Sequence, residues 1–198
     1  MALFNIFRKG SSSFMSSILN VLGMAVAFAA FYIILVQVNY DLNFNKGIKD
    51  SEKIFVMSSG SMDGDADKRQ LNFCRPLAEI ILEASPNIEC GGCLMFSTSE
   101  ESRYWIERDG AKQDIDLSVT RFSGNALTTL GFEAVSGSLE DLDYNSFAIS
   151  ESIAHKFNLE VGMCLGYDIY ENIWTIKAIF KDMPENSHFR DIDVVRNI

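Results

Sequence analysis

The 198-residue sequence predicts an α+β extracytoplasmic domain that follows one N-terminal transmembrane α-helix. The first observation is that residues 10–40 contain no charged side chain. Within them, the 21 residues of Ile18–Val38 would span roughly 30 Å as a helix, the thickness of the hydrocarbon core of a bilayer. The second observation is that strand and helix patterns after residue 41 follow no regular βαβ order, which favours an α+β domain.

The charges that flank the apolar run predict its orientation. Arg8 and Lys9 precede the run and Asp41 follows it, so the N-terminus is expected in the cytoplasm and the domain in the periplasm or outside the cell. The expected boundaries are a cytoplasmic or interfacial segment (1–15), the transmembrane helix (16–40) and the extracytoplasmic domain (41–198). A cleaved signal peptide is the competing interpretation, but the run exceeds the typical signal core of about 7–15 residues.

One face of the predicted span carries small residues. Ser16, Asn20, Gly23, Ala27 and Ala30 recur at alternating spacings of four and three, which places them on one side of a helix. Small residues allow a second helix to approach closely, and an Asn side chain can hydrogen-bond across such a contact. The pattern therefore predicts packing against partner helices. Chance is the alternative, since Ala and Gly are common in membrane spans.

The net charge is −10 and the isoelectric point is near 4.6. All 27 acidic residues follow the apolar run. An acidic domain is a poor match for nucleic acid, because binding requires basic surface that neutralises phosphates. We therefore expect a membrane protein with a solvated acidic domain and no nucleic-acid partner.

Four cysteines are present: Cys74, Cys90, Cys93 and Cys164. Cys90 and Cys93 form a C-x-x-C pair, for which three interpretations compete. A zinc site needs a second close pair of ligands, which the other cysteines and the two histidines do not supply. A thioredoxin-like redox pair precedes a helix, whereas this pair runs into an expected strand. The third interpretation is a glycine-containing turn whose thiols can form a disulfide in an oxidising compartment.

The clearest helix pattern in the domain covers residues 73–85. Leu77, Ile80, Ile81 and Ala84 repeat at helical spacing, Pro76 is tolerated in the first turn, and Pro86 ends the pattern. Two short helices are also expected, one over residues 125–130 that ends at Gly131 and one from the Ser150 cap to Phe157. The expected strands are 53–59, 94–98, 103–108, 111–119, 132–135, 147–150, 167–170 and 174–180.

Turn residues connect these elements. Asp109-Gly110 predicts a hairpin between the strands at 103–108 and 111–119. Gly137 is expected in the turn after residues 132–135. Gly162 and Gly166 are expected to bracket the turn before residues 167–170.

No catalytic, cofactor or metal site is predicted. Ser150 and Ser152 precede His155, but no third group is marked to orient a base. No phosphate-binding P-loop motif is present. Asp63, Asp65 and Asp67 alternate like a calcium loop, yet the Gly and Glu that such a loop requires are missing.

Five segments, in order, resemble MacB/FtsX-type ABC-transporter permeases over nearly the whole chain. Residues 18–46 look like the first transmembrane helix and its exit, and SEKIFVM resembles the strand that follows. LTTLGFEAVSGSLEDL, FAISESIAHKFN and WTIKAIFKDMPENSHF resemble successive landmarks of the MacB-like periplasmic core domain. The last is the most specific, a strand that leads into a turn motif with a structural role. The residues of this turn motif are Asp182, Pro184, Asn186, Ser187 and His188.

The resemblance implies a non-enzymatic permease component in the bacterial inner membrane. Such a subunit has four membrane helices, a large extracytoplasmic domain between the first two, and a cytoplasmic ATPase partner; it transmits ATP-driven motion for efflux or export. Permeases of this kind continue with three more helices, so the chain is expected to be a fragment or a truncated relative whose last strands lack partners. The alternatives are a single-pass membrane-anchored interaction or sensor module and, third, an envelope thiol oxidoreductase that uses Cys90 and Cys93.

Overall fold

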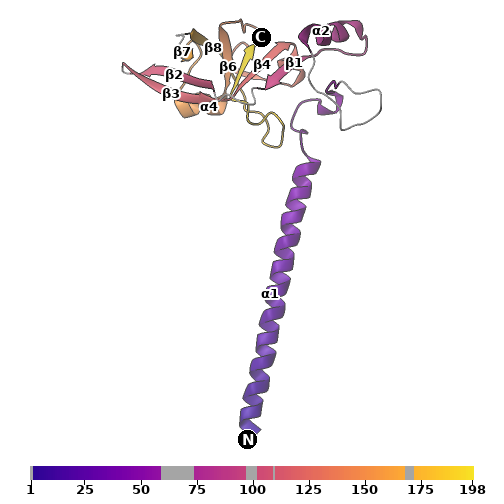
Figure 1. Cartoon of the computed structure of the whole chain (residues 1–198). Helices are drawn as coiled ribbons and strands as arrows, with labels where there is room; N and C mark the ends of the chain where they lie inside the picture. The colour runs from indigo at the N-terminus through magenta and orange to yellow at the C-terminus, as the bar shows by residue number, and fades with distance from the viewer. Residues whose placement is uncertain (1, 59–73, 97–101, 109, 168–171) are drawn as a thin grey trace. The chain divides into compact units, whose positions relative to one another are not determined.

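The structure is a computed structural model that describes residues 2–58, 74–96, 102–108, 110–167 and 172–198 (Figure 1). The side chains of residues 2–13, 96, 102 and 172 are outside the description. The chain divides into two compact units, Met1–Phe44 and Asn45–Ile198.

The first unit is one long helix. α1 runs from Ala2 to Leu42, and from Phe14 to Asn39 every side chain on it is exposed. Within the part of the chain that the structure describes, Phe14–Leu42 is the one helix long and apolar enough to cross a membrane, judged by length and composition. An apolar helix whose whole surface is exposed lacks the polar face that a helix on a soluble domain presents to water.

The second unit contains a nine-stranded mixed sheet. Its helices are α2 (Arg75–Ala84), α3 (Ala126–Thr129) and α4 (Glu151–Phe157), and a short 3-10 helix covers Ser51–Lys53. Its strands are β1 (Gly92–Phe96), β2 (Ser102–Arg108), β3 (Ala111–Leu117), β4 (Val119–Gly124), β5 (Ala134–Gly137), β6 (Ser146–Ser150), β7 (Cys164–Tyr167), β8 (Asn172–Phe180) and β9 (Val194–Asn197). Together with the N-terminal helix, this mixture confirms the predicted fold class.

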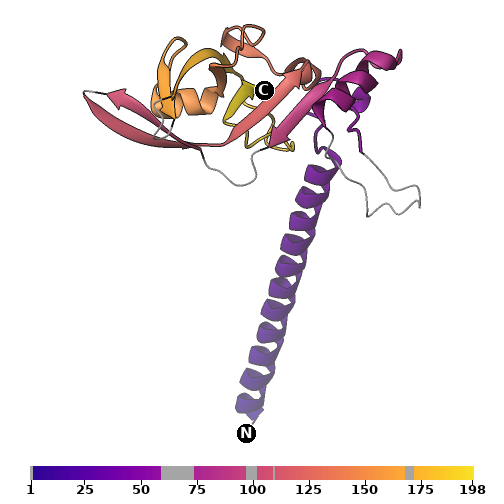
Figure 2. The same cartoon turned by 45° about the horizontal axis from the view of Figure 1, so that its top comes forward.

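The strand order is β1-β4-β9-β6-β8-β7-β2-β3, and β5 pairs with the end of β8 beyond β7. The pairs β4–β9 and β6–β8 are parallel, and the other neighbours are antiparallel. The predicted hairpin is confirmed as β2–β3, with Gly110 at a φ of 76° in its turn. The hairpin extends beyond the neighbouring strands in both views (Figures 1 and 2).

Two hydrophobic cores lie against the sheet. The first includes Phe147 and Ile149 of β6, and the second includes Ala148, the residue between them. Since successive side chains of a strand point to opposite faces, the cores cover the two sides of β6. The same alternation places Val194 and Val195 of β9 in different cores.

A β-bulge on β8 changes which residues face each core. Phe147 pairs with Ile176 and Ala148 pairs with Ala178, so Lys177 has no register partner on β6. Ile176 therefore faces the first core, whereas Ala178, two residues later, faces the second. One extra residue shifts the alternation by one, so a single strand supplies large side chains to both cores.

Several strand predictions are wrong. Residues 54–58 form no strand; they follow the 3-10 helix, and Phe55 and Val56 are 84% and 76% exposed. The predicted strand at 111–119 is two strands that meet at Ser118, and Gly166 lies within β7 and not in a turn. Gly137 is the last residue of β5, at a φ of 76°. β-branched composition gives no information on whether a neighbouring strand is available, so it cannot place these boundaries.

β9 was not predicted and lies near the middle of the sheet. It is parallel to β4 on one side and antiparallel to β6 on the other. The expectation that the last strands lack partners is therefore wrong for β9. Its residues, Val194–Asn197, are too few to show an alternating pattern.

We predict that Ile176→Ala on β8 lowers the free energy of unfolding by about 2–5 kcal/mol, because it leaves a cavity in the first core. Ile173→Ala on the same strand is the matched control, since Ile173 is 59% exposed and Ile176 is fully buried. Urea unfolding of the full chain in detergent, followed by tryptophan fluorescence, measures both. Equal losses for the two variants would contradict the assignment of the core.

Asp193 ties β9 to its neighbours and should make stability depend on pH. Its Oδ2 accepts the N–H of Ser118 at 2.9 Å, and its carbonyl oxygen accepts the N–H of Ser150 at 2.8 Å. Burial raises the pKa of Asp193 above its ordinary 3.8, although the Ser118 hydrogen bond acts in the opposite direction. The folded chain therefore binds more protons than the unfolded chain between these two pKa values.

We accordingly predict that the contribution of Asp193 to the free energy of unfolding grows as the pH falls through its folded pKa towards 3.8. Asp193→Asn keeps an oxygen acceptor and should remove this dependence. Urea unfolding at several values between pH 4 and pH 7 tests it, with the exposed Asp114→Asn on β3 as the control. If the free energy of unfolding depends on pH as before in Asp193→Asn, and this dependence is lost in Asp114→Asn, another group is responsible.

Candidate functional site at the root of the domain

The first residue of the second unit is fixed by two hydrogen bonds to the turn motif. The N–H of Asn45 donates to the carbonyl oxygen of Asn186 at 2.8 Å, and Oδ1 of Asn45 accepts the N–H of His188 at 3.1 Å. Asn45 has a φ of 62°, a left-handed conformation that Asn tolerates better than most residues. This geometry lets its backbone and side chain address the same turn.

Close packing beside these hydrogen bonds involves Gly47 and Pro184. A Cβ atom added to Gly47 would lie 2.8 Å from Cβ and Cγ of the proline ring, closer than real Cβ contacts. Ile48, the next residue, is 6% exposed and belongs to the second core together with Met183. The segment 45–48 is thus attached to the turn by hydrogen bonds and to the core by a buried side chain.

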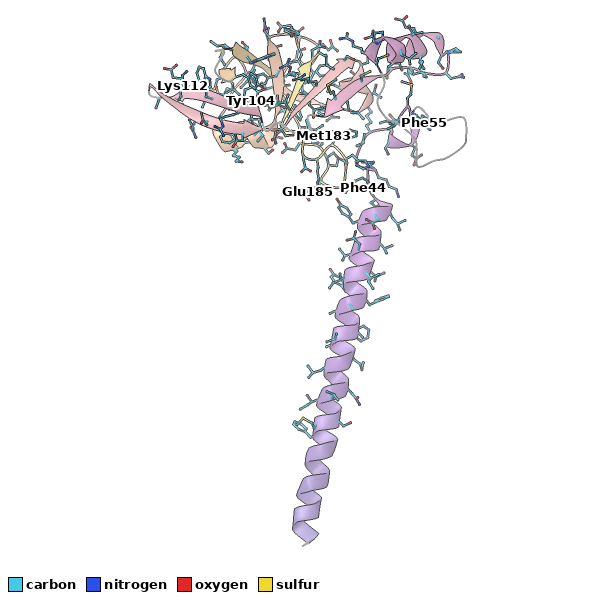
Figure 3. The ribbon with its side chains drawn as sticks, viewed as in Figure 1. Phe44, Phe55, Tyr104, Lys112, Met183 and Glu185 are labelled. Carbon is cyan, nitrogen blue, oxygen red and sulfur yellow. The ribbon has the colours of Figure 1, made fainter. Side chains whose placement is uncertain are left out.

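Two other residues of the turn motif, Asp182 and Ser187, accept hydrogen bonds from backbone N–H groups of the domain. Oδ1 of Asp182 accepts the N–H of Ser152 at 3.1 Å, in the first turn of α4, where a carboxylate is favourable. Oγ of Ser187, a residue that is 2% exposed, accepts the N–H of Phe189 at 3.2 Å. Figure 3 labels Met183 and Glu185 in this turn. We name the hydrogen bonds and contacts between segment 45–48 and residues 184–188 the root contact.

The end of α1 lies close to the root contact in the sequence. α1 ends at Leu42, and two residues, Asn43 and Phe44, precede Asn45. Within the first unit, the side chain of Asn43 donates to the carbonyl oxygen of Asn39 at 2.8 Å, which satisfies a terminal carbonyl group of the helix. The covalent connection between the helix and the first fixed residue of the domain is therefore short.

The other predicted residues are not part of the root contact. Ser16, Asn20, Gly23, Ala27 and Ala30 are exposed on α1. Whether they bind partner helices stays a prediction.

All four cysteines are free thiols in this structure. Cys93 lies on β1 opposite Ser123, whereas Sγ of Cys90 is 3.4 Å from Oγ1 of Thr129. A disulfide between Cys90 and Cys93 stays a prediction. In the part of the chain that the structure describes, no group of three or more His, Cys, Asp or Glu side chains could hold a metal ion.

Ser150, the residue before α4, and His155 within α4 both contact other residues of this helix. Oγ of Ser150 accepts the N–H of Ile153 at 3.4 Å, which confirms it as the predicted N-cap. His155 has an 81% exposed side chain, and its Nε2 is 3.8 Å from Glu151. The alternating residues Asp63, Asp65 and Asp67 lie outside the described residues, as do the side chains of segment 2–13.

Sequence reasoning identified the turn motif but missed Asn45 and Gly47. The signal available was a polar Asn-x-Gly segment directly after the apolar run. Asn45 and its partner His188 are 143 residues apart in the sequence, so no local pattern connects the two.

No family model matches the sequence, and no curated protein matches it either. Among solved structures, the chain is similar to a domain of a "putative Permease protein" from Porphyromonas gingivalis, with 22% identity and a TM-score of 0.52. The similarity covers 73% of this chain and 59% of that one, so this chain spans less than two thirds of the relative's length. It is also similar to the periplasmic region of MacB from Actinobacillus actinomycetemcomitans, with 11% identity, a TM-score of 0.48, and 77% and 70% of the two chains covered. The Porphyromonas gingivalis domain shows the fold at this level of identity, and that fold agrees with the resemblance read from the sequence.

We predict that Asn45→Ala lowers the free energy of unfolding of the domain by about 1–3 kcal/mol, because it leaves the His188 N–H without its acceptor and places Ala in a left-handed conformation. Asn45→Asp, which keeps an acceptor oxygen and tolerates that conformation, should lose less. Hydrogen exchange of the His188 amide, together with urea unfolding, measures both. Equal protection of that amide in the wild type and in Asn45→Ala would rule out the side-chain hydrogen bond.

Proposed function

We propose that this protein is a membrane-anchored component of an ABC-transporter permease system, in which the extracytoplasmic domain responds to motion of the helix. The observation that carries the proposal is the fold of Asn45–Ile198, which is that of a domain from a protein described as a permease. The exposed apolar helix before that domain and the five family-like sequence segments support the same assignment.

The membrane arrangement in this proposal follows from length and charge. α1 crosses the inner membrane between Phe14 and Leu42, with Arg8 and Lys9 in the cytoplasm. The domain of residues 45–198 then lies on the extracytoplasmic side, preceded by a span over 16–40 and a cytoplasmic or interfacial segment over 1–15.

The root contact gives this arrangement a mechanical basis. A displacement of the end of α1 would reach Asn45 through two residues, and then the turn at 184–188 through the two Asn45 hydrogen bonds. Packed segments transmit rigid-body motion because their contacts are close and directional. Two residues directly before this turn extend the connection: Asp182 contacts α4, and Met183 belongs to the second core. The proposed mechanism is transmission of motion for export or efflux, with no chemical step in this chain.

The proposed partners are other permease helices and a cytoplasmic ATPase. The small-residue face of α1 supports helix packing, because each of its five residues is exposed along the helix. Ala25 is also exposed but lies half a turn away, since residues two apart on a helix differ by about 200°. The two alanines, Ala25 and Ala27, therefore offer a matched pair for testing the face.

We predict that ATP hydrolysis activity purifies with the affinity-tagged full chain from its native membranes in mild detergent. Ala27→Leu should reduce this activity by about tenfold, because an enlarged side chain on a packed face opposes close approach of helices. Ala25→Leu, the same substitution on the opposite face, should leave the activity within about twofold of the wild type.

The readout is ATP hydrolysed per mole of tagged chain, with equal membrane insertion of each variant checked by sedimentation. Hydrolysis that is absent from the wild-type preparation, or equal in the two variants, would contradict the proposal. Either result would favour the single-pass interaction or sensor module.

A further inference from the structure

Two arginine side chains lie next to each other on the sheet face that carries the first core. Arg121 of β4 and Arg196 of β9 are register partners in the parallel pair. Val119 and Val194, two residues earlier on their strands, belong to the first core. Because residues two apart on a strand share a face, both arginines point to the same side of the sheet. Among the described residues, neither arginine forms a salt bridge.

Two buried nitrogen donors have no hydrogen-bond partner among the described residues. One is Nε of Arg196 itself, and the other is Nε1 of Trp174. Cζ of Arg196 lies over the Trp174 ring, 4.2 Å from its centre, so the two side chains form a cation–π contact. Both groups can only donate hydrogen bonds, and buried donors without a partner are rare in folded proteins. The missing partner must therefore be an acceptor.

The described residues also supply no carboxylate that offsets the charge of Arg196. Burial lowers the pKa of Arg196, and the nearby positive charge of Arg121 lowers it further. Among the described residues, the groups that favour its charged form are tyrosines. One of them, Tyr104, has its pKa raised to about 12 by burial, so its hydroxyl is neutral at physiological pH. Two neighbouring arginines that form no salt bridge among the described residues are unusual in a chain whose net charge is −10.

An exposed aromatic ring borders the site. Tyr144 is 69% exposed, and its ring centre lies 6.4 Å from that of Trp174. The turn that carries it is fixed, because Oγ of Ser146 accepts the N–H of Asp143 at 2.8 Å and Oδ1 of Asp143 accepts the N–H of Asn145 at 2.9 Å. The side chain of Asn197 on β9 donates to the carbonyl oxygen of Leu142 at 3.2 Å, which joins this turn to the strand of Arg196.

We propose that Arg121, Arg196 and Trp174 bind an oxyanion group, a carboxylate or phosphate, of a small organic molecule. The two guanidinium groups supply charge and paired donors that match such oxygens, and the indole N–H supplies a neutral donor. Tyr144 provides a flat surface for an aromatic or apolar body attached to the anion. The site does not depend on the permease assignment, since all its residues belong to the second unit, Asn45–Ile198.

The test uses proton–nitrogen NMR of the full chain in detergent micelles. Sodium benzoate and phenyl phosphate are the carboxylate and phosphate probes, and benzyl alcohol is a neutral molecule with the same ring. We expect benzoate or phenyl phosphate to shift the indole N–H of Trp174 downfield in a saturable manner. The indole N–H of Trp105, the other tryptophan, should stay unchanged. The probe that binds more tightly identifies the head group.

Arg121→Gln provides the decisive variant, because Arg121 is exposed and the substitution leaves both cores intact. It should weaken binding by about tenfold or more, the effect of losing a hydrogen bond to a charged group. Arg103→Gln changes the net charge equally at an exposed position on β2, 3.9 Å from Asp116, and should leave binding unchanged. Trp174→Phe keeps the aromatic ring and removes the indole donor, so calorimetry should show weaker binding of the same probe.

Three results would overturn the site. The first is a Trp174 signal that does not saturate with either anion. The second is an equal shift with benzyl alcohol, which would show that the ring stacks without recognition of charge. The third is equal binding by Arg121→Gln and Arg103→Gln, which would show that the effect is the general charge of the domain.

Discussion

Burial of the central strands on both faces holds the domain together. β6 is buried at every residue, and β9 places consecutive valines in opposite cores. A strand in this position must satisfy its backbone groups within the sheet, because water reaches neither face. β9 does so by pairing with β4 and β6 at once, and the bulge at Lys177 lets β8 contribute to both cores. The antiparallel hairpin β2–β3 and the short β1 occupy the two ends of this arrangement.

The root contact joins the start of the domain to this doubly packed sheet. Gly47 and Pro184 approach too closely for a larger residue than glycine, and Ile48 reaches the second core that also holds Ala178 and Val195. The segment is therefore part of the folded unit from its first residue. In the proposed permease, this continuity is what would allow motion of a membrane helix to reach the sheet without loss in a flexible linker.

The proposed anion site at Arg196 and Trp174 differs from the root contact in whether its polar groups have hydrogen-bond partners. The root contact is satisfied: its donors have acceptors and its apolar side chain is buried. The site at Arg196 and Trp174 has two buried donors that lack an acceptor among the described residues, and it has two neighbouring positive charges. Unsatisfied groups of this kind lower the stability of a domain unless something binds them, so their position beside a fixed aromatic turn supports the proposed anion site.

Features that depend on neighbouring residues could be predicted from local sequence patterns. The long apolar helix, α2, the cap of α4 at Ser150 and the β2–β3 hairpin each follow from composition, periodicity or a turn dipeptide, and each is present. The turn motif was also recognised from the sequence, because it resembled a known family. Only the tertiary structure decided what these elements contact. The partner of Asn45 lies 143 residues away, β9 is too short to be read as a strand, and the Lys177 bulge reverses the alternation that β8 would otherwise show. Local patterns report the conformation of a segment, whereas pairing and packing depend on which distant segment fills the space beside it.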